Sequence, residues 1–173
     1  MKVYRVTIGQ APDVQVLNLA SGWNLVSFGI TPVNPAVDAV FGITGRQTIL
    51  DQVYQWDPLG QVYQQVDELE ANRGYWVYSN VQGGTVLTVF GFQGGDTIAL
   101  EPGWNIVGPT QDVGIPDTER VIDPDSDAAI ETGIFGFDTD RDEYIDVDHT
   151  GGTLRRGEGY WIKAKEATEI PAQ

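Results

Sequence analysis

Apolar and polar residues alternate along much of the chain with a period of two. Residues 3–8, 14–19 and 85–90 each show this alternation. Successive side chains of a β-strand point to opposite faces of a sheet, so the pattern predicts strands in these segments. Residues 23–28 carry apolar side chains on both faces, which is typical of a strand buried inside a sheet. The sequence therefore predicts a mainly β protein.

Helical periodicity is limited to two short segments. In residues 34–41, Asn34 is suited to the N-cap and Pro35 to the first helical position. Apolar residues then recur at spacings of three and four, at Val37, Val40 and Phe41. Residues 115–122 repeat this pattern more weakly. We therefore expect one short helix in each half of the chain.

Two segments combine alternating runs with turn residues and predict β-hairpins. In the first, residues 57–60 (Asp-Pro-Leu-Gly) separate the alternating residues 53–56 and 61–66. Asp, Pro and Gly supply the backbone angles and side-chain hydrogen bonds that a tight turn needs. In the second, residues 134–137 and 144–147 flank the acidic loop 138–143. We expect the same hairpin in both places, with a different loop in the second.

The predicted elements occur twice in the same order. Residues 22–26 (Gly-Trp-Asn-Leu-Val) return as residues 103–107 (Gly-Trp-Asn-Ile-Val), and residues 74–77 (Gly-Tyr-Trp-Val) return as residues 159–162 (Gly-Tyr-Trp-Ile). The residue numbers differ by 81 at the first motif and by 85 at the second. A repeat that keeps its large aromatic residues predicts a duplicated architecture, because each copy must place the same rings in the same kind of environment.

The two copies are expected to form one compact body that spans residues 1–173. Copy one covers about residues 1–81 and copy two about residues 82–173. By the offset of 81, residues 4–8 correspond to residues 85–89, and no Ser-rich, Pro-rich or charged spacer separates the copies. We therefore predict two interleaved, pseudo-symmetric copies of a β unit, arranged as a sandwich or in a barrel-like body.

Aromatic residues at matched positions are the main candidates for structural and binding roles. The four matched tryptophans are predicted to pack in the core or between the copies, and they are Trp23, Trp76, Trp104 and Trp161. The aromatic residues beside the hairpin loops are better placed for an exposed platform that stacks on sugar rings, and they are Trp56, Tyr63, Phe137 and Tyr144. A shared packing role explains the second group equally well.

Acidic residues at alternate positions suggest a calcium site, because a hard cation prefers several carboxylate oxygens at short range. One group consists of Asp138, Asp140 and Asp142, and the other of Asp123, Asp125 and Asp127. The first group departs from the EF-hand pattern, since Glu143 stands where glycine is required and His149 where a bidentate glutamate is required. The alternatives are a solvated acidic hairpin loop, a calcium ion bound in a geometry other than the EF-hand, and a calcium ion shared by the two loops.

Composition and charge exclude several classes of partner. The chain has 173 residues, 41% of them hydrophobic, and a net charge of −15. Binding to a nucleic-acid backbone needs clustered Lys and Arg, and here ten basic residues face 25 acidic ones. The absence of an apolar run of about 20 residues argues against membrane insertion. We therefore expect no nucleic-acid partner and no membrane insertion.

Residues for catalysis are scarce. His149 is the only histidine, cysteine is absent, and no serine lies in a nucleophile-elbow context. A glycosidase would need two carboxylates in a cleft, one of them in an apolar setting, and no acidic residue lies inside an apolar run. The sequence therefore predicts that the protein is not an enzyme and uses no cofactor other than calcium.

The repeated motifs resemble the Trp-rich segments that recur in large bacterial cell-surface and secreted proteins. The resemblance is carried by residues 22–24, 56–57 and 74–76 and by their counterparts 103–105, 137–138 and 159–161. Such segments bring no catalytic residues with them. The resemblance implies a surface or extracellular setting, and small β modules of this kind also suit a virion.

These observations favour a non-catalytic structural or adhesion module of a virion or an extracellular surface assembly, such as a decoration, fibre or adaptor subunit. Its expected partners are neighbouring protein subunits of a symmetric assembly. The first alternative is a carbohydrate-binding module that uses the aromatic platform to hold a glycan. The second is a calcium-stabilised accessory domain of a secreted enzyme.

Overall fold

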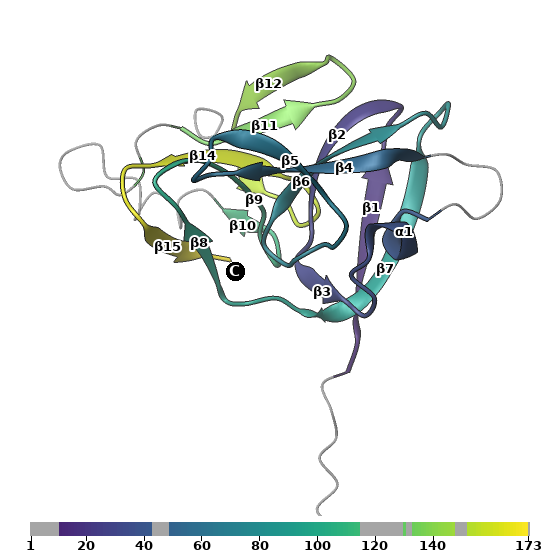
Figure 1. Cartoon of the computed structure of the whole chain (residues 1–173), viewed down its shortest axis with the longest axis horizontal. Coiled ribbons are helices and arrows are strands. Elements are labelled where there is room, and N and C mark those ends of the chain that lie inside the picture. The colour runs from purple at the N-terminus through teal and green to yellow at the C-terminus, as the bar shows by residue number, and fades with distance from the viewer. Residues whose placement is uncertain (1–10, 43–48, 115–129, 131–132, 148–151, 173) are drawn as a thin grey trace, which may run out of the picture.

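The computed structural model describes residues 11–42, 49–114, 130, 133–147 and 152–172 (Figure 1). The described residues form strands and one short helix, so the predicted mainly β architecture is confirmed. The strands pair in several antiparallel sheets, and none of the described sheets is closed on itself. Among the described residues, no helix has the length and apolar character that a membrane crossing requires.

The first group of elements runs from β1 to β7. Its members are β1 (Asp13–Leu19), β2 (Gly22–Ser27), β3 (Ile30–Pro32), α1 (Val37–Val40), β4 (Ile49–Asp57), β5 (Val62–Val66), β6 (Gly74–Ser79) and β7 (Thr85–Gln93). They form a three-stranded sheet in the order β1-β7-β3 and a four-stranded sheet in the order β2-β6-β4-β5. We refer to this group as the first half.

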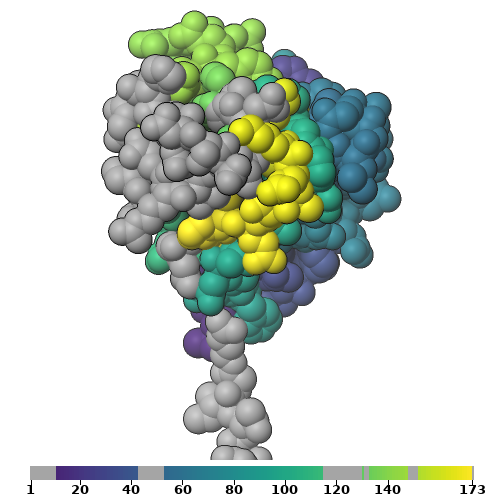
Figure 2. All heavy atoms as spheres, turned by 90° about the vertical axis from the view of Figure 1, so that its left-hand side faces the viewer, coloured from purple at the N-terminus to yellow at the C-terminus, as the bar shows by residue number. Residues whose placement is uncertain are grey.

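The second half runs from β8 to β15. Its members are β8 (Thr97–Leu100), β9 (Gly103–Val107), β10 (Val113–Gly114), β11 (Phe135–Asp138), β12 (Glu143–Asp146), β13 (Thr153–Leu154), β14 (Tyr160–Ala164) and β15 (Thr168–Pro171). They form a four-stranded sheet in the order β12-β11-β14-β9 and the two-stranded sheets β15-β8 and β10-β13. The hairpin of β11 and β12 projects at one end of the molecule (Figures 1 and 2).

Sheet pairing groups strand β7 with the strands that precede it in the chain. Strand β7 pairs with β1 along one edge and with β3 along the other, so residues 85–93 join the first half by hydrogen bonding. The prediction assigned residues 85–89 to the second copy because they correspond in sequence to residues 4–8, which lie outside the described residues. With the halves divided after Gln93, each described sheet draws its strands from one half.

The helix prediction holds for one segment. Helix α1 begins at Val37 rather than directly after Asn34, and Ala36 is its N-cap residue. The side chain of Asn34 still acts at this end, because its Oδ1 accepts a hydrogen bond from the N–H of Ala36 at 3.2 Å. The second predicted helix, at residues 115–122, lies outside the described residues.

Each half has its own apolar core. In the first half the core contains residues from Leu17 to Val89, including the fully buried Phe28 and Tyr75. In the second half it contains residues from Ile98 to Ala172. A third cluster takes residues from both halves, and we call it the junction cluster. It consists of Leu25, Trp76, Ile106 and Trp161, with Tyr54, Trp56, Trp104, Phe135 and Phe137 packed against it.

The Gly-Trp-Asn motifs form the same turn in both halves. Asn24 donates from Nδ2 to the carbonyl oxygens of Ala20 and Gly22, at 3.0 and 2.9 Å, and its Oδ1 accepts the N–H of Ala20 at 2.9 Å. Asn105 makes the same three hydrogen bonds at corresponding positions. Gly22 and Gly103 have φ angles of 102° and 95°, which favour glycine. The motif therefore fixes the start of β2 and of β9.

The Gly-Tyr-Trp motifs serve the junction between the halves. The buried hydroxyl of Tyr75 accepts the N–H of Glu70 at 2.7 Å, and that of Tyr160 accepts the N–H of Arg155 at 2.8 Å. The glycine before Tyr75 lies against the other half, because a Cβ atom on Gly74 would overlap Ile106. The tryptophan after each tyrosine belongs to the junction cluster. Each motif thus supplies one residue to its own core and two to the junction.

The two hairpin loops differ in sequence but share one turn. Oδ1 of Asp57 accepts the N–H groups of Leu59 and Gly60, at 3.0 and 3.1 Å. Oδ1 of Asp138 accepts the N–H groups of Asp140 and Arg141, also at 3.0 and 3.1 Å. The residue before the returning strand has a positive φ in both loops. The predicted hairpins are therefore present, and the aspartate that begins each loop stabilises it.

Candidate ligand-binding pocket

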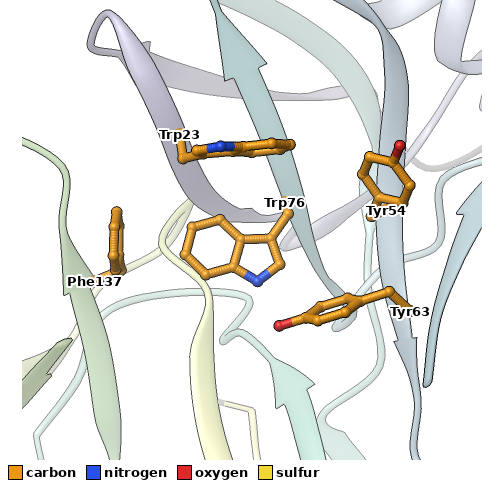
Figure 3. Close-up of a pocket in the computed structure, with 5 residues that line it drawn as sticks. All are labelled: Trp23, Tyr54, Tyr63, Trp76 and Phe137. Carbon is orange, nitrogen blue, oxygen red and sulfur yellow. The ribbon is translucent and has the colours of Figure 1, made fainter. Parts of the chain in front are cut away.

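A pocket of about 460 Å³ opens at the junction between the halves, and five aromatic residues line it (Figure 3). They are Trp23 on β2, Tyr54 on β4, Tyr63 on β5, Trp76 on β6 and Phe137 on β11. Four of them come from the first half and one from the second. Its volume lies within the range of about 300–1,000 Å³ that is usual for small-molecule sites.

Strand pairing places the four residues of the first half on one face of their sheet. Tyr54 lies opposite Trp76 in the pairing of β4 with β6, and Trp76 lies opposite Leu25 in the pairing of β6 with β2. Trp23 shares the face of Leu25 because side chains two residues apart point the same way. Tyr63 joins the same face, since it lies opposite Trp56, which is two residues after Tyr54. This face packs against the second half.

The rings meet mostly edge to face. Trp76 lies at the centre, with Trp23 above it, Phe137 on one side and the two tyrosines on the other (Figure 3). Its ring centroid is 6.2 Å from that of Trp23 at an interplanar angle of 89°, and 4.8 Å from that of Phe137 at 80°. Trp23 and Tyr54 lie 6.3 Å apart at 54°. Edge-to-face contacts are favourable and hold the ring planes in fixed directions.

The pocket has a buried floor and an exposed rim. Trp76 is 7% exposed, whereas Trp23 is 39% and Tyr63 is 48% exposed. A tightly packed floor fixes the shape of the pocket, and the exposed rings give a ligand access to it. The arrangement therefore suits the binding of a small molecule or of an end group on a larger one.

The lining is apolar and uncharged. All five lining residues are aromatic, and the polar atoms they bring are tyrosine hydroxyls and indole N–H groups. Burial raises the pKa of Tyr63 above its ordinary value of 10.0, and the neighbouring Tyr144 raises it further, whereas a hydrogen bond with Trp76 acts in the opposite direction. Tyr63 therefore stays protonated at neutral pH. The pocket offers ring faces and few hydrogen-bonding groups.

The predicted platform residues separate into two pairs. Trp56 packs on Tyr63 at a centroid distance of 5.0 Å, and Phe137 packs on Tyr144 at 5.5 Å. Tyr63 and Phe137 line the pocket. Trp56 turns into the junction, where its Nε1 donates a hydrogen bond of 2.7 Å to the carbonyl oxygen of Trp104. Tyr144 is exposed, and its ring centroid lies 6.4 Å from that of Trp76. The single four-residue platform is therefore replaced by a pocket that contains two of its members.

The four tryptophans predicted to be structural do not share one environment. Trp76 and Trp161 are buried and Trp104 is half-buried, and all three belong to the junction cluster. Trp23 departs from the prediction, because it is exposed at the rim of the pocket. Its strand, β2, is the edge strand of the four-stranded sheet, so one side of the ring has no further strand to cover it.

Tyr54 is the lining residue that the sequence reasoning missed. It lies in the alternating run 53–56, two residues before Trp56, and a strand places such residues on the same face. The hairpin predicted from residues 53–66 therefore contained the signal. Its counterpart in the second half is Phe135, which packs against Trp104 at a centroid distance of 6.2 Å.

The acidic residues considered for calcium are largely engaged in other interactions or lie outside the described residues. Asp123, Asp125 and Asp127 are outside them. Asp138 stabilises its own loop and lies 3.6 Å from the guanidinium of Arg141. Arg141 also lies 3.7 Å from Glu143. Within the described part of the chain, no three acidic, histidine or cysteine residues converge as metal ligands. Asp140 and Asp142 lie in the loop on either side of Arg141.

Comparisons of the chain with known protein families, with curated proteins and with solved structures found no match.

Proposed function

We propose that this protein is a non-catalytic adhesion module of a virion or an extracellular surface assembly, and that it binds its ligand in the five-residue aromatic pocket. The observation that carries the proposal is the pocket itself, which combines a buried aromatic floor with an exposed aromatic rim. Its lining contains no acid, base or nucleophile, so it is built for binding rather than for chemistry. The resemblance of the repeated motifs to cell-surface and secreted segments supports the setting.

We further propose that the halves are two copies of one β unit, packed face to face in a sandwich-like body about a pseudo-two-fold axis. Reciprocal contacts support this proposal. Val26 forms an isolated bridge with Glu158, and the corresponding residues of the repeat, Val107 and Arg73, form another. In an isologous interface residue i meets residue j, and the second copy of j meets the second copy of i.

Backbone hydrogen bonds across the junction follow the same reciprocity. The N–H of Ser27 donates to the carbonyl oxygen of Gly157 at 3.0 Å, and the N–H of Gly108 donates to that of Asn72 at 3.4 Å. Ser27 corresponds to Gly108 and Asn72 to Gly157 in the sequence repeat. A junction of this kind joins the copies through backbone hydrogen bonds. The aromatic side chains at matched positions can therefore differ between the two copies.

The two halves carry different aromatic residues at one matched position that borders the pocket. The first half carries Trp56 at the position where the second half carries Phe137. The larger ring of Trp56 reaches the backbone of Trp104, and Phe137 instead lines the pocket beneath Trp23. The proposed duplication thus yields a binding site on one side of the junction, while Trp76 and Trp161 each keep an edge-to-face contact with the matched aromatic residue of the other half.

An exposed apolar face supports the proposal that neighbouring subunits are partners. The outer face of the sheet β1-β7-β3 carries five exposed apolar side chains, Val14, Val16, Val86, Phe90 and Phe92. The register places Phe90 opposite Val14. Contiguous exposed apolar residues on a soluble domain often mark a protein interaction site. Sedimentation of the protein with Phe90→Lys tests this face, since loss of self-association in the variant is the expected result.

A carbohydrate is the second candidate for the ligand. Trp23 and Tyr63 on the rim have exposed ring surface, which is the property that lets aromatic residues stack on sugars. The tyrosine hydroxyls provide hydrogen-bonding groups beside these rings. This candidate uses the same pocket and differs from other ligands in its need for directional hydrogen bonds.

The test of the binding module compares variants of the rim with a matched surface variant. Trp23→Ala and Tyr63→Ala remove exposed rings that line the pocket, whereas Leu59→Ala removes an apolar side chain that is 74% exposed in a hairpin loop. Binding to glycan arrays and to intact bacterial cells is measured for each protein. We expect the two rim variants to lose binding and Leu59→Ala to keep it. Equal binding by all three variants would show that the pocket is not the adhesion site.

A further inference from the structure

The lining of the pocket offers many aromatic ring surfaces and few hydrogen-bonding groups. Its polar groups are limited to the hydroxyls of Tyr54 and Tyr63 and to two indole N–H groups, and one of these, on Trp76, is already hydrogen-bonded with Tyr63. A sugar presents many hydroxyl groups and loses their bonds to water when it enters such a site. A cation without N–H groups has no such bonds to replace.

We infer that the ligand of this pocket carries a quaternary ammonium group, of the trimethylammonium type found in choline. This inference rests on the proposed binding function of the pocket and names its ligand class. Quaternary ammonium groups are held by the negative faces of several aromatic rings, with Trp the most effective ring. The pocket has two tryptophans, two tyrosines and one phenylalanine in its lining.

The directions of the ring planes favour a cation over a flat ligand. Trp23 and Trp76 are nearly perpendicular, at 89°, and Trp76 and Phe137 meet at 80°. These rings lie around Trp76, and their planes point in different directions, as the close-up shows (Figure 3). A sugar or another flat ligand stacks best on parallel exposed faces. A roughly spherical trimethylammonium group instead contacts faces that surround it.

The other side of the junction already holds a cation against the matched indole. Nζ of Lys163 lies 6.0 Å from the ring centroid of Trp104, the counterpart of Trp23. This distance is within the range of cation–π attraction. The counterpart of Lys163 in the first half is Tyr78, whose ring packs edge-on against Trp23 at 5.2 Å. The pocket side therefore adds an aromatic ring at the position where the other side supplies an ammonium group.

Charge and size also fit this ligand class. The chain has a net charge of −15, and its field attracts cations toward an uncharged cleft. The volume of about 460 Å³ exceeds that of a trimethylammonium group alone and leaves space for the chain that carries it. A head group at the end of a larger molecule, such as the phosphocholine of a surface polymer, would enter in this way.

The decisive experiment compares choline with its uncharged analogue 3,3-dimethylbutan-1-ol, which has the same shape. Each is titrated into the intact wild-type protein, and binding is followed by calorimetry and by tryptophan fluorescence. We expect choline to bind at least about tenfold more tightly, because only the cation interacts with the ring quadrupoles. Equal affinity of the two compounds overturns the inference but leaves an apolar binding pocket, so the proposed function survives. Binding of neither compound also overturns it.

A series of amines and a salt titration test the same point independently. Affinity should fall from choline through the dimethyl compound to ethanolamine, because each lost methyl group restores an N–H that must give up hydrogen bonds to water in a lining with few acceptors. The affinity for choline should also fall with added salt, whereas that for the uncharged analogue should not. Phosphocholine is titrated in the same way, because it has the trimethylammonium group of choline and also the phosphate of a polymer head group. Tighter binding of phosphocholine than of choline would indicate a head group on a polymer, and tighter binding of choline would indicate the free alcohol.

Paired variants separate ring chemistry from packing. Trp23→Phe keeps an aromatic face at the rim and should retain choline binding within about tenfold, whereas Trp23→Leu removes the face and should abolish the preference for choline over its analogue. Leu59→Ala is the control outside the pocket. Thermal melting verifies that each variant is folded. If Trp23→Leu keeps the full preference for choline, ring faces do not select the ligand and the inference is wrong. The comparison of choline with its uncharged analogue uses the wild-type protein, so it tests the inference even if a variant does not fold.

Discussion

The indole Nε1 of Trp56 donates a hydrogen bond of 2.7 Å to the carbonyl oxygen of Trp104, which lies in the other half of the chain. This bond ties the hairpin of the first half to the edge strand of the second. The matched position in the second half is Phe137, whose side chain has no N–H to donate to Trp23. The two sides of the junction therefore differ, and the pocket lies on the side of Phe137.

The variant Phe137→Trp should close the pocket. A second indole would occupy the space beside Trp76 and bring a donor toward the carbonyl oxygen of Trp23, as Trp56 does on the other side. We expect the free energy of unfolding to rise by about 1 kcal/mol from the added hydrogen bond. Ligand binding should be lost. Urea denaturation and a choline titration check both parts, and retained binding in a folded variant would show that Phe137 does not limit the pocket.

The opposite variant, Trp56→Phe, should weaken the junction. It removes the hydrogen bond to Trp104 and leaves a smaller ring against Trp161, whose centroid lies 5.2 Å from that of Trp56. We expect a loss of about 1–3 kcal/mol in the free energy of unfolding, from the hydrogen bond and the reduced packing together. Urea denaturation followed by far-ultraviolet circular dichroism measures it. A change below about 0.5 kcal/mol, usual for surface substitutions, would place Trp56 outside the stabilising contacts.

Gly74→Ala should destabilise the protein by forcing the halves apart. A Cβ atom at this position would overlap the side chain of Ile106 and crowd its backbone carbonyl carbon. We expect a loss of about 1–3 kcal/mol, the usual cost of overpacking a close contact. The matched control is Gly95→Ala, since a Cβ atom there meets its nearest neighbour at 3.6 Å. Thermal melting of both variants measures the difference, and equal melting temperatures would contradict the close contact at Gly74.

The sequence was sufficient to predict many of the strands and two of the five pocket residues as ligand-binding candidates. Alternation in residues 53–66 placed Trp56 and Tyr63 beside the loop of a hairpin, one on each strand, and the register pairs them directly. The repeat offset likewise identified Phe137 as the residue that corresponds to Trp56. These predictions succeeded because strand periodicity and hairpin turns are local properties that neighbouring residues determine.

Contacts between distant segments could not be predicted in the same way. The pairing of β7 with β1 and β3 joins strands that are far apart in the sequence, and the alternation in residues 85–90 does not indicate which strands they pair with. The exposure of Trp23 was missed because its motif matches that of Trp104, while the residues around the two rings differ. Lys163 lies over Trp104, and Tyr78 packs against Trp23. A repeat indicates equivalent backbones and not equivalent surroundings.

Alkaline pH should destabilise the protein through its two buried tyrosines. Burial raises the pKa of Tyr75 from its ordinary value of 10.0 to about 12, and burial raises that of Tyr160 in the same direction. Above pH 10 the unfolded chain therefore releases protons that the folded chain keeps. Proton release favours the unfolded state, so this contribution to stability is complete below pH 10 and is lost as the pH rises toward the pKa of the folded state.

The variant Tyr75→Phe isolates this effect. A shift of about two pKa units corresponds to roughly 2.7 kcal/mol, which the wild type should lose at this residue between about pH 10 and pH 12. The variant should be about 1–2 kcal/mol less stable at neutral pH, because the N–H of Glu70 loses its acceptor, and its stability should fall less steeply in alkali. Urea denaturation across this pH range measures both curves. Parallel curves for the two proteins would show that Tyr75 does not titrate differently in the folded and unfolded states.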